Sequence, residues 1–229
     1  ASISGMAARR IWQPAFSSFL PGLAGVKGIP LWTFYTNRGQ GMNSFGIDNK
    51  GNAIMEFNSA NTAFENTQVK GFRTFLKIDG EYYEPFFTYE KEAKRQMRMN
   101  KNSFKIIETN EKYGIEVTVN YYVLPNESIG ALVRQVSVKN IGDSAKEVQV
   151  IDGLPKIITY GIANGEFKEM SNLFKSWADI RNLENKVPYY TLRASTKDSA
   201  EVSDVEGGYY YLTVRDGKLQ DVILSLIHI

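Results

Sequence analysis

The side chains that carry most enzyme chemistry are almost absent from this sequence of 229 residues. It contains no cysteine, and its single histidine is His228. A thiolate nucleophile is therefore excluded, and a catalytic triad, a proton shuttle or a histidine metal site would have to be built around His228. The sequence predicts no complete active site and no metal or other cofactor held by this chain.

Carboxylates and one glycine-rich loop are the remaining groups of chemical interest. Carboxylates at turns and strand edges are ordinarily solvated, and the sequence places no two of them at a catalytic separation. The loop Gly39-Gln40-Gly41 lies between two predicted strands, whereas a phosphate-binding loop follows a strand and opens a helix. We therefore expect the glycines to allow a close approach of backbone rather than to hold phosphate.

The charge balance argues against two classes of partner. The net charge of +2 at pH 7 gives too weak a field to hold nucleic acid or an anionic membrane surface. No apolar run approaches the ~20 residues that cross a bilayer. The lack of cysteine fits a reducing compartment, so we expect a cytoplasmic location.

One short segment is locally basic. Its basic residues are Lys91, Lys94, Arg95, Arg98 and Lys101. Because Glu90 and Glu92 lie among them, we interpret the segment as a solvated face or a strand edge protected by charge, and not as an anion site.

Residues 113–154 predict three consecutive antiparallel strands, around which the rest of the chain is organised. The apolar residues of the first strand alternate with polar ones, as expected of a half-buried strand. They are Ile115, Val117, Val119, Tyr121 and Val123. Turn residues at 125–128 and 140–144 separate this strand from the next two.

The remaining segments extend the same pattern. Asp79-Gly80 and Asp216-Gly217 are tight hairpin signals, residues 59–66 read as a polar loop before a long strand over 67–78, and Pro85 marks an edge strand. The aromatic spacing in 166–177 predicts one short helix. Because open sheets beyond ~10 strands curl or split, about a dozen strands predict an all-β, two-layer antiparallel sandwich.

The ends of the chain require separate treatment. The sequence opens on ASISGMAARR without an initiator methionine, which leaves open a signal segment upstream of Ala1, and residues 224–229 read LSLIHI. This hexapeptide resembles the translation of a transposase-type sequencing adapter, although it would also continue a strand from Val222. We expect residues 1–223 to form the β domain and exclude 224–229, with His228, from fold reasoning.

Three segments carry a resemblance to a known family: residues 22–78, 151–162 and 187–202. The most specific parts are NRGQGMNSFG at 37–46 and GFRTF at 71–75. With these segments the chain resembles the N-terminal domain of cellobiose phosphorylase-like glycoside phosphorylases. Within that group it is most similar to the 1,2-β-oligoglucan phosphorylases.

The resemblance implies a super-β-sandwich of the galactose mutarotase-like type, followed in the intact enzyme by a linker helix and an (α/α)6 barrel. It also implies inverting phosphorolysis of a β-glucooligosaccharide, with inorganic phosphate as co-substrate and an Asp as general acid. In the family these catalytic and phosphate-binding residues belong to the barrel. None is transferred to this chain, which we expect to be inactive alone. A homodimer is a further expectation.

The resemblance also suggests how this domain could contribute to a sugar site. Related sandwiches lend loops to the acceptor side, and here Asn37 and Arg38 could bond sugar hydroxyls while Trp32 and Tyr35 stack on a ring. In the alternative interpretation, which we prefer, Arg38 is a structural clamp and Trp32 a core residue. On the same reasoning, Ile157 and Tyr160 are candidates for contacts with the barrel.

Two other classes of function are alternatives to a phosphorylase domain. A sugar 1-epimerase would share the sandwich architecture, but its acid–base chemistry usually requires histidines that this chain lacks. A stand-alone carbohydrate-binding or structural module is the main alternative. It predicts that the isolated chain binds oligosaccharide.

Overall fold

The computed structural model describes residues 14–20, 22, 24–87, 93–170, 172–195, 200–201 and 207–224. The chain divides into two compact units. The first contains residues 1–48 and 57–156, and the second contains residues 49–56 and 157–229. Each unit is described separately below.

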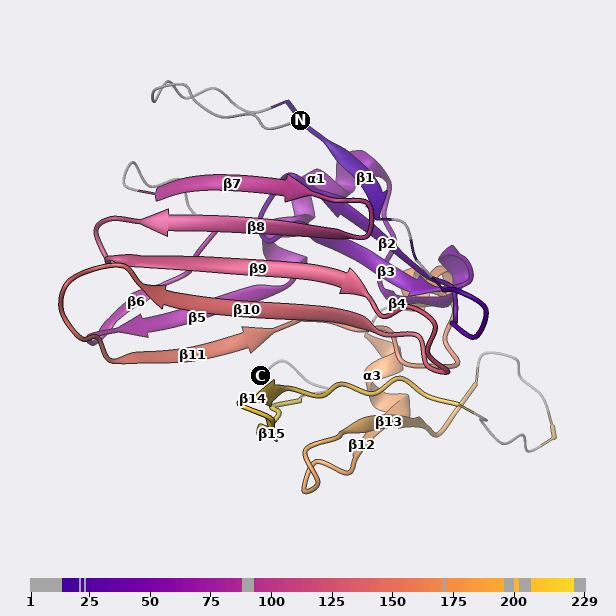
Figure 1. The fold of residues 1–229 in the computed structure, drawn as a ribbon. Helices are drawn as coiled ribbons and strands as arrows, with labels where there is room; N and C mark the ends of the chain where they lie inside the picture. The colour runs from indigo at the N-terminus through magenta and orange to yellow at the C-terminus, as the bar shows by residue number, and fades with distance from the viewer. Residues whose placement is uncertain are drawn as a thin grey trace. The chain divides into compact units, whose positions relative to one another are not determined.

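The first unit consists mainly of antiparallel strands (Figure 1). Its elements are β1 (Ser17–Leu20), β2 (Leu31–Thr36), β3 (Met42–Ile47), α1 (Ala60–Lys70), β5 (Arg73–Ile78), β6 (Glu81–Tyr83), β7 (Ala93–Met99), β8 (Ser103–Asn110), β9 (Ile115–Val123), β10 (Leu132–Asn140) and β11 (Val148–Gly153). Strand β2 pairs with β1 and β3. A four-stranded sheet has the order β10-β9-β8-β7, and a three-stranded sheet has the order β11-β5-β6.

The alternation predicted for β9 is confirmed. Every second residue from Ile115 to Val123 is buried, and the residues between them are half-buried. Strand β9 pairs with β8 on one side and β10 on the other. The hairpin β5–β6 turns at Asp79 and Gly80, whose φ angles of 49° and 94° are those of the turn that an Asp-Gly pair favours.

A column of three aromatic rings joins strands from different sheets. Tyr35 of β2 stacks on Phe104 of β8 with 4.7 Å between ring centroids, and Phe104 stacks on Tyr121 of β9 at 4.6 Å. All three side chains are buried. Stacked aromatic rings bury large areas and add a geometric preference of their own, so this column is central to the core of the first unit.

The second unit contains shorter elements. They are the 3-10 helix η1 (Lys50–Asn52), β4 (Ala53–Met55), α2 (Asn164–Met170), α3 (Leu173–Trp177), β12 (Ala178–Arg181), β13 (Tyr189–Leu192), β14 (Val214–Arg215) and β15 (Lys218–Leu219). Strands β12 and β13 form one hairpin and β14 and β15 another, the latter with Asp216-Gly217 at its turn as predicted. Phe174 packs on Phe167 and Trp177, with centroid distances of 6.3 and 5.4 Å.

One helix contradicts the prediction for residues 59–78. The polar loop and the first half of the long strand form α1, and only β5 remains as a strand. Only Ala63 and Thr67 of α1 are buried, so the helix lacks the apolar stripe that would reveal it in the sequence. Gly71 ends the helix: its N–H bonds Thr67 O at 3.1 Å, and a Cβ there would lie 2.4 Å from the same oxygen.

Two further predictions about strands and helices are wrong. Strand β11 pairs with β5 instead of extending the β9–β10 hairpin, and the single helix expected over 166–177 is two, α2 and α3. The edge strand before Pro85 is confirmed as β6. Residues 225–229 of the proposed adapter sequence lie outside the described residues. The chain is mostly β, with several antiparallel sheets and a few short helices.

Candidate functional site

The two segments with the most specific resemblance meet in the first unit. Gln40 of the loop 37–41 donates from Nε2 to Thr74 Oγ1 of β5 at 3.0 Å. Gly39 and Gly41 have φ angles of 50° and 83°. A Cβ on Gly39 would lie 2.9 Å from Gln68 Cα of α1, and a Cβ on Gly41 would lie 2.6 Å from Phe104 Cε2 of β8, so the close approaches that the glycines permit are to other parts of the same chain.

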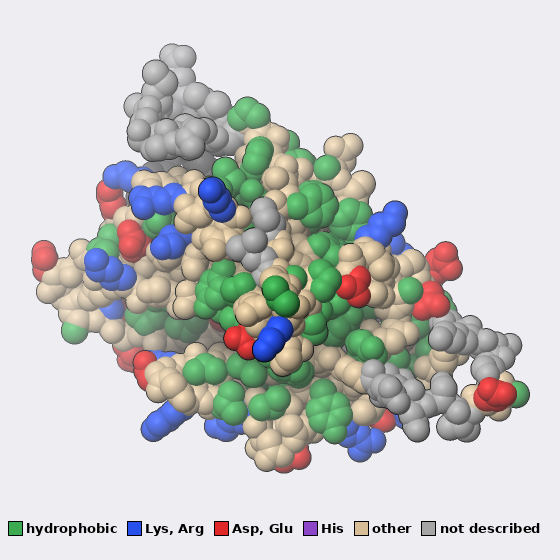
Figure 2. All heavy atoms as spheres, turned by 45° about the vertical axis from the view of Figure 1, so that its right-hand side comes forward, with side chains coloured by type: hydrophobic (Ala, Val, Ile, Leu, Met, Phe, Trp, Pro, Cys, Tyr) green, Lys and Arg blue, Asp and Glu red, His purple; other side chains and the backbone are tan. Residues whose placement is uncertain are grey.

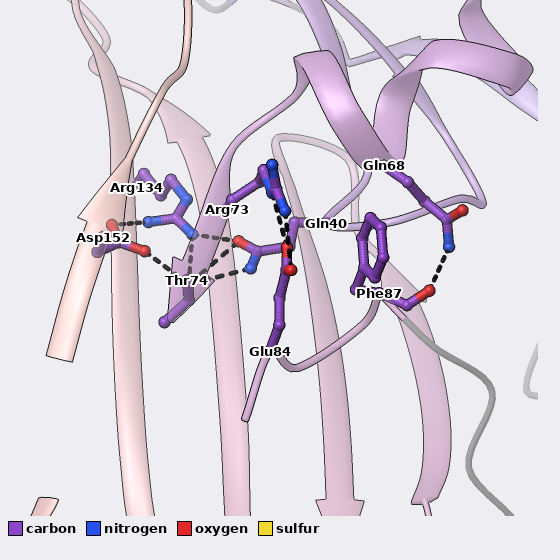
Figure 3. A network of polar contacts seen from close by, with 8 residues as sticks. All are labelled: Gln40, Gln68, Arg73, Thr74, Glu84, Phe87, Arg134 and Asp152. Atoms are coloured by element: carbon purple, nitrogen blue, oxygen red, sulfur yellow. Dashed lines mark hydrogen bonds and ion pairs between the residues drawn. The ribbon is translucent and has the colours of Figure 1, made fainter. Parts of the chain in front are cut away.

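Gln40, Thr74, Arg134 and Asp152 form a buried network, which we call the inner cluster (Figure 3). Thr74 Oγ1 donates to Asp152 Oδ1 at 2.6 Å, and Arg134 Nη2 donates to Thr74 Oγ1 at 3.2 Å. Arg134 also donates to Asp152 and to the Gln40 carbonyl oxygen. The cluster therefore ties β5, β10, β11 and the loop 37–41 together.

The surroundings of Arg134 keep its guanidinium charged. It lies 4.9 Å from the ring centroid of Phe72 and 5.7 Å from that of Tyr121. Burial lowers the pKa of Arg134, but Tyr121 and Asp152 raise it, and the net pKa is above its ordinary value. Burial raises the pKa of Tyr121 to about 12, against the opposing effect of Arg134. The Arg134 guanidinium and the Tyr121 phenol therefore do not change charge near pH 7.

Gln68, Arg73, Glu84 and Phe87 form a second group, which we call the outer cluster (Figure 3). Arg73 donates to Glu84 through Nε–Oε1 at 2.7 Å and Nη2–Oε2 at 2.8 Å, a bidentate pair. The Glu84 hydrogen bond raises the pKa of Arg73. Its guanidinium lies 4.7 Å from the ring of Phe75 and 5.2 Å from that of Phe87.

The outer cluster lines a shallow hollow in the surface. Its lining residues are Gly39, Gln40, Gln68, Phe72, Arg73, Glu84, Pro85, Phe86 and Phe87. The hollow encloses essentially no volume of its own, whereas most small-molecule sites enclose ~300–1,000 Å³. It offers an amide, a neutralised ion pair and aromatic carbon, which suit contact with one face of a hydroxylated ring and supply no general acid or base.

A buried carboxylate supports one wall of the hollow. Glu108 is 1% exposed and accepts hydrogen bonds from Tyr83 Oη, Arg95 Nε and, at 2.9 Å, the backbone N of Phe86. Phe86 has a φ of 66°, a conformation that costs a non-glycine residue about 1 kcal/mol or more. The Glu108 carboxylate therefore holds the turn 85–87 in its shape.

The structure places two of the predicted sugar contacts in packed surroundings. Tyr35 is 6% exposed, stacks on Phe104 and donates from Oη to Met99 Sδ at 3.2 Å. Its ring therefore presents no open face to a sugar. Trp32 is half-buried and meets Phe57 edge to face at 5.7 Å. These contacts favour the interpretation of both rings as core residues.

Asn37 and Arg38 lie together and contact the chain itself. Asn37 Nδ2 donates to Pro14 O at 2.8 Å, and Asn37 Oδ1 accepts from Phe16 N and from Arg38 Nη1 at 3.1 Å each. Arg38 also lies 5.8 Å from the Phe64 ring of α1. These contacts favour the clamp interpretation of Arg38, and sugar binding by the pair remains a prediction.

The two proposed barrel contacts belong to the second unit. Ile157 is half-buried, and Tyr160 is exposed and meets Tyr209 edge to face at 5.2 Å. Their role at a domain interface remains a prediction.

The charged residues of the two clusters are not among the predicted site residues, although the strand positions of Arg134 and Asp152 indicate buried charges. Arg134 falls on the same strand face as Val136 and Val138, and Asp152 falls on the face of Val148 and Val150. A charge at an inward position of a strand indicates a buried partner. Arg73 and Glu84 give no such signal, because Glu84 follows the end of β6.

The surface and its charges add little to the site. Figure 2 shows basic and acidic side chains scattered among hydrophobic ones on the face turned to the viewer.

Within the described ranges no three His, Cys, Asp or Glu residues are grouped to hold a metal ion. Nor does any helix in that part of the chain have the length and apolar character to span a membrane. Lys94 and Arg98 lie exposed on the edge strand β7, which confirms the charged-edge interpretation for these two residues. Arg95 of the same strand instead pairs with the buried Glu108, and Lys91 lies outside the described residues.

Comparison with known proteins gives no relative. No protein-family model matches the sequence. No curated protein matches it either.

Proposed function

We propose that this chain is the non-catalytic β-sandwich domain of an inverting glycoside phosphorylase whose chemistry belongs to a separate helical barrel. The observation that carries the proposal is that segments 37–46 and 71–75, on which the resemblance rests, form one connected part of the first unit. Gln40 bonds Thr74, and the Phe45 and Phe72 rings stack at 6.3 Å. The packed antiparallel sheets support a galactose mutarotase-like sandwich as the specific fold.

The proposed reaction is phosphorolysis of a β-linked oligoglucoside, with the β-1,2 linkage as the expected one. A phosphate oxygen bonds to the anomeric carbon as the glycosidic C–O bond breaks, and an Asp of the barrel gives its proton to the leaving oxygen. The products are α-glucose 1-phosphate and an oligoglucoside shortened by one unit. The lack of cysteine supports a cytoplasmic location for the enzyme.

In this proposal the domain carries out no chemistry. It positions Asn37 and Arg38 and supports the barrel. The polar groups of the inner cluster bond one another, which makes the loop 37–41 a rigid platform. Asn37 and Arg38 lie on that platform, and Ile157 and Tyr160 would contact the barrel. A rigid platform favours binding because less side-chain freedom is lost when a ligand or domain docks.

The test uses the open reading frame that contains this chain. Its protein, incubated with inorganic phosphate and β-1,2-oligoglucosides, should release α-glucose 1-phosphate, which ³¹P NMR detects. The 229-residue chain alone should release none. Release of free glucose without phosphate consumption would contradict the proposal.

The outer cluster favours a second candidate, a stand-alone carbohydrate-binding module. Arg73 and Glu84 provide planar polar groups beside the aromatic ring of Phe87. If this candidate is correct, calorimetric titration of the isolated chain with oligoglucosides shows binding. Loss of that binding in Arg73→Ala assigns it to the hollow, whereas loss in Trp32→Ala or Arg38→Ala assigns it to the loop 37–41. No binding by the isolated chain would eliminate this candidate and leave the phosphorylase proposal untouched.

A further inference from the structure

The methionines of the described residues differ in their access to solvent. Met42 and Met55 are 0% and 3% exposed, and Met97 and Met170 are half-buried, whereas Met99 is 48% exposed. A dissolved oxidant reacts with a thioether only when it reaches the sulfur. The chain has no cysteine, so no thiol competes for such an oxidant. Of the methionines that the structure describes, Met99 therefore has the most accessible sulfur.

Met99 is exposed because it lies at the edge of a sheet. It is the last residue of β7, and β7 is the outermost strand in the order β10-β9-β8-β7 (Figure 1). Its partner in register on β8 is Phe104, which is 0% exposed. Directly opposed residues of an antiparallel pair project to the same face, so the Met99 side chain lies on the inward face beside Phe104. Met99 therefore borders the core of the first unit and still faces water.

The Met99 sulfur is also the hydrogen-bond acceptor of a buried group. Tyr35 is 6% exposed and donates from Oη to Met99 Sδ at 3.2 Å. Within the described residues this hydroxyl has no other hydrogen-bond partner. A thioether is a weak acceptor, but a buried donor that loses its acceptor destabilises the fold. The same sulfur is thus open to oxidants and required by Tyr35, whose ring stacks on Phe104 in the aromatic column.

We propose that Met99 is a modification site, at which a peroxide oxidises the thioether to the sulfoxide and thereby weakens the packing of the first unit. A lone pair of Sδ attacks one oxygen of hydrogen peroxide, the S–O bond forms as the O–O bond breaks, and the other oxygen leaves as water. The sulfur loses two electrons and the peroxide gains them. A methionine sulfoxide reductase reverses the change, since two thiols supply the electrons and the oxygen leaves as water.

The hydrogen bond from Tyr35 determines where the new oxygen is added. Tyr35 Oη occupies the inner side of the sulfur, so the oxygen adds to the lone pair on the solvent side. The sulfur of a sulfoxide carries a partial positive charge and accepts a hydrogen bond poorly. The Tyr35 hydroxyl then loses its partner in a buried position, and a polar group lies beside Phe104. We expect the midpoint of thermal unfolding to fall by roughly 3–8 °C.

The first experiment measures which methionines react. The 229-residue chain is treated with hydrogen peroxide, and tandem mass spectrometry follows the oxidation of each methionine with time. Met99 should be oxidised roughly ten-fold faster than the buried methionines and several-fold faster than the half-buried ones. Because Met6 lies outside the described residues, every chain carries Met6→Leu, which removes its contribution. Oxidation of a half-buried methionine as fast as that of Met99 overturns the proposal.

The second experiment measures the consequence for stability. The oxidised and untreated chains are compared by thermal unfolding, and treatment with sulfoxide reductases should restore the original midpoint. Met99→Leu is the matched control: it keeps the volume of the side chain but has no oxidisable sulfur, so peroxide should leave its midpoint unchanged. In Tyr35→Phe no hydroxyl loses its partner, so oxidation of Met99 should lower the midpoint by a smaller amount than in the parent chain.

The outcomes test the reaction and its consequence separately. Selective oxidation of Met99, a reversible fall in the midpoint and a smaller fall in Tyr35→Phe support the proposal. An unchanged midpoint after complete oxidation of Met99 overturns it, and so does an equal fall in Tyr35→Phe. If Met99→Leu is as sensitive to peroxide as the parent chain, another residue is responsible and the proposal fails. None of these outcomes depends on the proposed phosphorylase function.

Discussion

Arg73 and Thr74 are neighbours on β5 but belong to clusters of different character. Thr74 points inward, where Arg134 and Asp152 have side-chain exposures of 7% and 25%. Arg73 points outward and pairs with Glu84 beside an open hollow. The alternation of a strand places adjacent residues in surroundings of different polarity. The same ion-pair chemistry thus serves as a fixed support on one side of the strand and as an accessible surface on the other.

The largest change in the free energy of unfolding is expected at Arg134. Arg134→Ala removes the charged donor of the Asp152 carboxylate and of the Gln40 amide oxygen. We expect a loss of about 3–5 kcal/mol in the free energy of unfolding, measured by urea denaturation. Arg134→Lys is the matched control: it keeps the charge but not the fork, so its loss should be smaller. An Ala variant as stable as the parent chain would show that the inner cluster is not a support.

Tyr121 allows a pH test of the inner cluster. Its folded pKa of about 12 lies above the ordinary value of 10.0. Its stabilisation is therefore complete below pH 10 and is lost as the pH rises through 12, because the unfolded phenol ionises first. The loss should reach about 2–3 kcal/mol. Urea denaturation at a series of alkaline pH values should show a shallower decline for Tyr121→Phe. Equal slopes for the two chains would contradict the prediction.

The Arg73–Glu84 pair of the outer cluster should contribute less to the free energy of unfolding than Arg134 does. Arg73→Ala breaks a bidentate pair that is partly exposed, with exposures of 25% for Arg73 and 18% for Glu84. We expect a loss of about 1 kcal/mol, which is screened by salt. A double-mutant cycle with Glu84→Ala, followed by thermal unfolding at low and high ionic strength, measures the coupling. A coupling as large as the effect of Arg134→Ala would remove the distinction between the two clusters.

The smallest effect is expected at the exposed pair Lys94–Glu111. The hydrogen bond and the charge of Lys94 lower the pKa of Glu111. In Lys94→Ala the pKa of Glu111, followed by NMR titration, should return toward its ordinary value while the unfolding midpoint stays unchanged. A marked fall in the midpoint would mean that the pair contributes more than its exposure allows.

Much of the strand architecture could be predicted because period and turn chemistry are local properties. The alternation in β9 and the Asp-Gly turns at 79–80 and 216–217 can each be predicted from a few consecutive residues. Helix α1 could not be predicted in this way, since only Ala63 and Thr67 are buried and its apolar period is weak. The partner of β11 is non-local: it pairs with β5, about seventy residues earlier.

The candidate site was predictable only in part. The close approach of Gly39 and Gly41 was expected, but its targets, Gln68 on α1 for Gly39 and Phe104 on β8 for Gly41, required the fold. Arg134 carried a signal in its inward strand position, whereas Arg73 and Glu84 come together only because the chain after the β5–β6 hairpin returns beside the start of β5. Tyr35, one candidate for stacking on a sugar ring, is buried. An aromatic residue in a strand next to a loop does not reveal from sequence which face it occupies.

The column of Tyr35, Phe104 and Tyr121 has a consequence for the motions of the first unit. Each ring is in contact with the next at less than 5 Å between centroids, so a half-turn of one ring sweeps volume that its neighbour occupies. The flips of these rings are therefore coupled and require the strands β2, β8 and β9 to separate together. In NMR spectra the two sides of each ring should give separate signals, and the backbone amides of the three strands should exchange with solvent as one cooperative unit.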